Sequence, residues 1–136
     1  MYQRRTDWGI YVEEILKDET GQRRGIFEDE SCVVRYVRDF NRNVKKCNAP
    51  VFAVSISEDR IRVLFGEAEE EDVLKIFRIT NSSFAGAMDQ RGIKVKFTRK
   101  LRYCMDRYEL LRELKRMKDG EDTGGRFAKW NRAGHF

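Results

Sequence analysis

Histidine and proline are almost absent from this chain of 136 residues, which has one of each. The histidine, His135, is the second-last residue, so a catalytic triad or a histidine general base is hard to assemble. The glycine patterns of the P-loop and of dinucleotide-binding turns are missing too. We therefore predict no catalytic residues, no enzyme activity and no cofactor.

Cysteine is scarce as well, with Cys32, Cys47 and Cys104 widely spaced. An odd number at irregular spacing is not typical of a disulfide framework. No pair has the close spacing of structural zinc ligands, so we expect no metal site from these residues and His135. Reduced cysteines favour an intracellular protein, cytoplasmic or nuclear, or within the host cell if the chain is viral.

Long apolar runs are also lacking. No window approaches the ~18 consecutive apolar residues of a membrane span. Residues 1–7 are mixed in character, which argues against a secretory signal. We therefore expect no membrane partner.

Charge, in contrast, is abundant and unevenly distributed. The net charge is +5, and residues 91–136 hold 14 Lys and Arg against 6 Asp and Glu. Residues 51–90 reverse this balance, with 4 basic against 8 acidic side chains. Such a separation favours an oriented electrostatic surface, whose positive end would attract a polyanion.

The first half of the chain predicts a hairpin followed by a helix. Residues 8–18 alternate as a strand, although 12–17 could also be helical, and residues 24–28 provide a returning strand. Ser31 is the expected N-cap of a helix. Its apolar stripe comprises Val33, Val37, Phe40 and Val44. Asn48 and Pro50 should end this helix.

A second hairpin over 51–65 and a helix over 67–79 repeat this order weakly. A short helix over 82–88, a strand over 93–97 and a long helix over 99–118 follow. The prediction is a single α+β domain over 1–118, with two hairpin–helix units, a short fifth strand and a long C-terminal helix. Residues 119–136 are assigned to a linker and a basic, aromatic tail.

The densest run of positive charge lies between residues 91 and 102, without an acidic residue. Its members are Arg91, Lys94, Lys96, Arg99, Lys100 and Arg102. Lys94 and Lys96 should project from one face of the strand, with Arg99 and Lys100 at the start of the next helix. These cations could neutralise phosphates. They could also be a solvated strand face that discourages edge pairing.

A second basic feature lies on the first helix. Arg35, Arg38, Arg42 and Lys45 recur on one side of it. A solvent-facing surface opposite the apolar stripe explains the same spacing.

Two local alternatives remain for nucleic-acid contacts. Residues 70–98 have the order of a winged helix-turn-helix, with a turn at 80–82 and Lys94 and Lys96 on the wing. Phe127 and Trp130 in the tail could stack on bases, or dock on protein instead.

We predict a small regulatory or architectural protein that binds DNA or RNA without catalysis. Reversing the charges of Lys94, Lys96, Arg99 and Lys100 should abolish binding without unfolding the domain. The alternative is a protein–protein interaction subunit: an adaptor, an inhibitor or a structural component of an assembly. A homodimer along Leu101, Tyr108, Leu111 and Leu114 would be one form of it.

Overall fold

The computed structural model describes residues 8–20, 25–119 and 126–129. Its strands are β1 (Gly9–Asp18), β2 (Val51–Ser57), β3 (Arg60–Phe65), β4 (Val95–Cys104) and β5 (Arg126–Lys129). Its helices are a 3-10 turn (Ile26–Glu28), α1 (Glu30–Cys47), α2 (Glu70–Asp89) and α3 (Arg107–Asp119). The predicted α+β class is confirmed.

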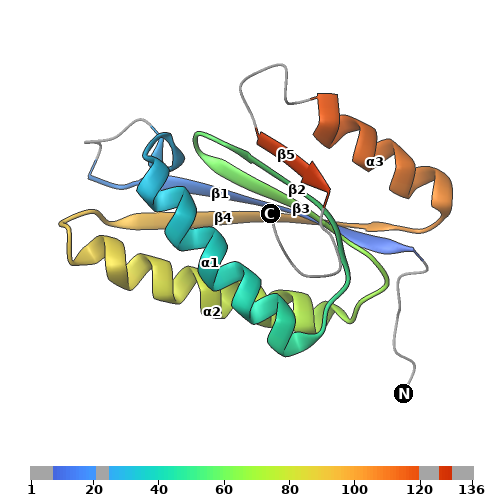
Figure 1. Cartoon of the computed structure of the whole chain (residues 1–136), viewed down its shortest axis with the longest axis horizontal. Coiled ribbons are helices and arrows are strands. Elements are labelled where there is room, and N and C mark those ends of the chain that lie inside the picture. Colours follow the sequence, from blue (N-terminus) through green and yellow to red (C-terminus); the bar gives the residue numbers. More distant parts are fainter. Residues whose placement is uncertain (1–7, 21–24, 120–125, 130–136) are drawn as a thin grey trace.

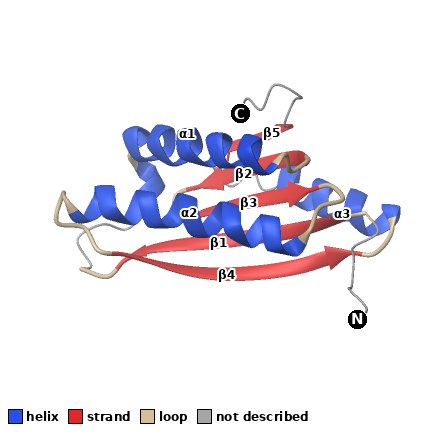
Figure 2. Cartoon of the chain, turned by 90° about the horizontal axis from the view of Figure 1, so that it is seen from below, coloured by secondary structure: helices blue, strands red, loops and turns tan. Residues whose placement is uncertain are grey.

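The strands form one antiparallel sheet in the order β4-β1-β3-β2-β5. Helices α1 and α2 lie along one face of this sheet, and α3 lies on the other side near one end (Figures 1 and 2). Alternate residues of each strand therefore enter two different layers. On β1, Ile10 and Val12 join the large core under α1 and α2, whereas Tyr11 joins a small cluster under α3.

Helix α1 forms where its apolar stripe predicts it. Val33, Phe40 and Val44 are buried, and Asn48 ends the helix in the left-handed region with φ 54°. The N-cap is Asp29 rather than Ser31, because the Asp29 carboxylate accepts a hydrogen bond from the Ser31 backbone N–H at 2.9 Å. The predicted stop is confirmed, and the predicted start is displaced by two residues.

The structure differs from the first predicted hairpin at its returning strand. Residues 26–28 form a 3-10 turn, and β1 pairs instead with β3 and β4. Phe27 explains the difference, since its ring packs edge-on against Tyr36 at 5.4 Å and its N–H donates to the Glu58 carbonyl. The second predicted hairpin is present as β2 and β3.

The C-terminal third also differs from the prediction. The expected short strand is the ten-residue β4, and α3 begins at Arg107 instead of residue 99. Helix α2 is continuous through residues 80–82, where we predicted a break. Residues 126–129, which the sequence places in a tail, form β5 beside β2.

Candidate nucleic-acid interface

On the face of the sheet that α1 and α2 leave uncovered, the charged side chains lie on three neighbouring strands. Across β4, β1 and β3, the register places Lys96 beside Lys17, and Glu13 between Lys100 and Arg62. Strand alternation sends these side chains away from the large core. Helix α3 covers only the end of this face, where it packs on Tyr11, Ala53, Leu64 and Cys104 through Met117.

Positive charge gathers on this uncovered face. We call it the basic face and define it by seven side chains: Lys17, Arg60, Arg62, Lys96, Lys100, Arg102 and Arg116. Among the described residues, three carboxylates pair with them, those of Glu13, Asp59 and Glu113. The basic face therefore keeps a surplus of positive charge, which favours anions over cations near it.

A pocket of about 270 Å³ opens between the basic face and α3, lined by Tyr11, Glu13, Arg62, Arg102, Arg116 and Met117. Glu13 accepts a hydrogen bond from Arg60 at 2.6 Å and another from the Tyr11 hydroxyl at 3.1 Å. The Arg102 guanidinium lies 4.6 Å from the centre of the Tyr11 ring. Burial, reinforced by the Glu13 charge, raises the pKa of Tyr11 to about 12.

Arg102 and Arg116 meet a second carboxylate on α3. Arg102 donates to both oxygens of Glu113, at 3.0 and 2.9 Å, and Arg116 lies 3.6 Å from one of them. Glu113 thus holds two guanidinium groups, just as Glu13 lies beside Arg60 and Arg62. Each guanidinium carries five N–H donors, so donors remain for a bound anion.

The structure brings three of the predicted basic residues onto this face: Lys96, Lys100 and Arg102. Arg99 points the opposite way, where its Nε bonds to the fully buried Glu14. Burial raises the pKa of Glu14, and the Arg99 guanidinium opposes that shift. The expectation that Arg99 can be reversed without unfolding is therefore physically unsound, because a glutamate there would face Glu14.

The remaining predicted cations lie elsewhere. Arg35, Arg38 and Arg91 line a groove between α1 and α2. Arg42 pairs with Asp39 at 3.5 Å, Lys45 is exposed in the last turn of α1, and Lys94 precedes β4. Since α1 covers the far side of the sheet (Figure 1), Lys96, Lys100 and Arg102 lie on the opposite face from the cations of α1, whereas Arg91 lies on the same side as those cations.

Sequence reasoning missed Lys17, Arg60, Arg62 and Arg116. Arg60 and Arg62 carry a signal, because cations two residues apart on a strand share one face. Their position on the same face as Lys100, one strand away, depends on the strand order β4-β1-β3, which local patterns do not specify.

The structure also contradicts two other hypotheses drawn from the sequence. The continuous α2 removes the turn of a winged helix-turn-helix. Leu101 lies on β4, apart from Tyr108, Leu111 and Leu114 on α3, so the predicted dimer stripe is not one surface. Trp130 and His135 lie outside the described residues.

Within the described residues, no group of three or more His, Cys, Asp and Glu side chains could hold a metal ion. Cys32 and Cys104 are buried, Cys47 is half-buried, and all three are free thiols. Burial raises the pKa of the Cys104 thiol to about 11. None of the helices described here is long and apolar enough to cross a membrane.

No protein-family model and no curated protein matches this sequence. In structure, the chain is similar to a REP-associated tyrosine transposase bound to a REP hairpin, with a TM-score of 0.66 and 10% sequence identity. The likeness covers 91% of this chain and 74% of the transposase chain. A transposase is an enzyme, so this comparison contradicts the prediction of a protein without catalysis. At 10% sequence identity, this similarity shows a shared fold and nothing more.

Proposed function

We propose that this chain binds nucleic acid, in the first instance a DNA hairpin, on the basic face. The observation that carries the proposal is the surplus of cations on the one sheet face that the long helices leave open. The fold supports it, since a similar chain is bound to a hairpin.

The dimensions of β4 suit a nucleic-acid strand. Lys96 and Arg102 are six residues apart on β4, which is about 20 Å at the usual strand rise. One strand of a duplex carries a phosphate about every 3.4 Å of helix axis, so this span equals the axial rise of about six nucleotides. Lysines in the middle of the face can neutralise their phosphates, and arginines at the pocket can form paired hydrogen bonds.

The test is a charge reversal on the basic face. Lys96→Glu with Lys100→Glu should weaken the affinity for a labelled DNA hairpin at least tenfold at near-physiological salt. The matched control is Lys75→Glu with Arg78→Glu on exposed positions of α2, which changes the net charge equally. Equal affinity of both variants for the hairpin would refute the basic face as the binding site.

Strand cleavage through a tyrosine is a second candidate, favoured by the transposase fold and by one exposed side chain. Tyr108 on α3 is 72% exposed, with the Arg112 guanidinium 5.1 Å from its ring centre. A tyrosine hydroxyl can attack a phosphodiester, forming a phosphotyrosyl bond and releasing a sugar hydroxyl. A denaturation-resistant protein–DNA adduct that Tyr108→Phe abolishes would support it. An adduct that survives this substitution would exclude Tyr108 as the nucleophile.

A further inference from the structure

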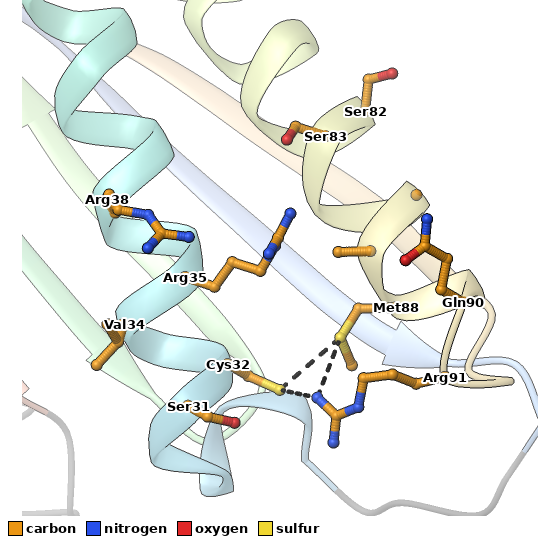
Figure 3. Close-up of a pocket in the computed structure, with 12 residues that line it drawn as sticks. Ser31, Cys32, Val34, Arg35, Arg38, Ser82, Ser83, Met88, Gln90 and Arg91 are labelled. Atoms are coloured by element: carbon orange, nitrogen blue, oxygen red, sulfur yellow. Dashed lines mark hydrogen bonds between the residues drawn. The ribbon is translucent and has the colours of Figure 1, made fainter.

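A second basic surface lies on the opposite side of the molecule, in the groove between α1 and α2 (Figure 3). The groove encloses about 1020 Å³. Arg35 and Arg38 line it from α1, Ser82 and Ser83 line it from α2, Gln90 lines it from the α2 C-cap, and Arg91 closes one end. We call it the α1–α2 groove.

The charges in the α1–α2 groove have one sign. None of the described residues that line it is acidic. Arg35 and Arg38 form no ion pair with any described residue. The nearby Asp39 is already engaged, by the Ser83 hydroxyl at 3.1 Å and by Arg42 at 3.5 Å. Two guanidinium groups are therefore free to meet an anion.

Arg91 differs from these two because the protein holds it in place. Its guanidinium lies 3.4 Å from Asp29 and donates to the Cys32 sulfur at 3.6 Å. Figure 3 shows it at the end of the groove, beside Met88. A fixed cation at one end and two free cations along α1 suit an extended anion.

The opposite wall of the α1–α2 groove supplies neutral hydrogen-bonding groups. Ser82 on α2 and Gln90 at its C-cap are exposed and can donate to a phosphate, whereas the exposed Ser83 already donates its hydroxyl proton to Asp39. Gly86 lies between them, and a Cβ added there would meet nothing within 4 Å. Hydroxyl and amide side chains are common phosphate contacts, and the missing side chain leaves room for a backbone to approach.

We propose that the α1–α2 groove binds the phosphodiester backbone of a second nucleic-acid segment, so that one molecule holds two segments on opposite faces. The groove is larger than one phosphate requires, and its cations extend along a helix. This inference rests on the proposed function for the first segment, although the groove can be tested separately. It assigns Arg35 and Arg38 a role distinct from that of the basic face.

The experiment uses four full-length proteins and a labelled DNA hairpin. They are the wild type, the basic-face variant (Lys96→Glu with Lys100→Glu), the groove variant (Arg35→Glu with Arg38→Glu) and a protein with all four changes. The basic-face variant should retain weak binding, and the protein with all four changes should lose a further tenfold in affinity. If the basic-face variant and the protein with all four changes bind the hairpin with equal affinity, the α1–α2 groove proposal is wrong.

A capture assay then tests the bridging. Wild-type protein on a bead-bound hairpin should retain a second, fluorescent hairpin, and the groove variant should retain at least tenfold less. Light scattering of the saturated complex should give one protein with two hairpins. A mass of one protein with one hairpin, or two proteins with two, overturns the proposal.

The outcomes separate the two proposals. No hairpin binding by the wild type would overturn both. Wild-type affinity in the basic-face variant, with loss in the groove variant, would overturn the basic face alone. Unchanged capture by the groove variant would overturn the groove alone, and an acidic protein segment would then be the better occupant.

Discussion

Glu14 lies in the apolar layer between the sheet and the helices, where its side chain has no exposed surface. Arg99 contacts it from β4, and Asn81 on α2 donates to it at 3.0 Å. Asn81 in turn accepts a hydrogen bond from the Tyr36 hydroxyl at 2.6 Å. This chain of polar groups connects the sheet to both helices, and its stability depends on the charge of Arg99.

We expect Arg99→Gln to lower the free energy of unfolding by about 2 kcal/mol at neutral pH, because it leaves a buried carboxylate without its cation. Without Arg99, the pKa of Glu14 rises further. A carboxyl with a raised folded-state pKa favours the folded state at low pH and loses that advantage as the pH rises. The loss of unfolding free energy caused by Arg99→Gln should therefore be smaller in mildly acidic buffer than at neutral pH. Urea titrations at the two pH values would measure it.

Arg116→Gln is the matched control, since Arg116 is 60% exposed and pairs with Glu113 at the surface. Its cost should stay below about 1 kcal/mol at either pH. If Arg99→Gln is equally harmless, or if its deficit grows as the pH falls, the account of Glu14 is wrong.

Tyr11 provides a second test at the scale of a single residue. Its pKa of about 12 lies above the ordinary value of 10.0, so the folded state favours the protonated phenol. The resulting stability is complete below pH 10.0 and is lost as the pH rises towards about 12. A rapid absorbance titration should show a tyrosine ionising in that range, and Tyr11→Phe should remove it. Persistence of that step in the variant would assign it to another tyrosine.

At the scale of elements, the continuous α2 makes a stability prediction. Gly86 is helical, and an added Cβ there meets nothing within 4 Å, so Gly86→Ala should stabilise the fold by about 1 kcal/mol. Gly9→Ala should destabilise it, because a Cβ there would lie 2.3 Å from the Phe65 carbonyl oxygen. Thermal melting followed by circular dichroism distinguishes the two variants. A melting temperature of Gly86→Ala below that of the wild type would contradict the placement of Gly86 inside a continuous helix.

The helices and strands that could be predicted from the sequence are those with a local pattern of apolar and polar residues. The stripe of α1 and the alternation of β2 and β3 were sufficient to place them, and Lys96 was correctly placed on a strand. Residues 99–104 were assigned to a helix because Leu101 fits a helical spacing with Tyr108, Leu111 and Leu114. Pairing of β4 with all ten residues of β1 overrides that spacing. The pairing also turns Arg99 towards Glu14, which no local pattern indicates.

At the scale of the whole molecule, the sequence located the surplus of positive charge but not its division between two faces. Lys96, Lys100 and Arg102 join Arg60 and Arg62 only because β1 lies between β4 and β3. Arg35 and Arg38 lie across the sheet from them. Each face presents its own surplus, which is the physical basis for proposing one binding surface and then a second.

The most direct measurement of the central claim is the salt dependence of DNA-hairpin affinity. Each phosphate contact contributes a slope of about −0.7 to −0.9 to the logarithm of the binding constant against that of salt. The wild type should therefore bind with a steep negative slope, and Lys96→Glu with Lys100→Glu should make it shallower by about 1.5. Binding that is insensitive to salt, or a slope that this variant leaves unchanged, would contradict recognition of nucleic acid by the basic face.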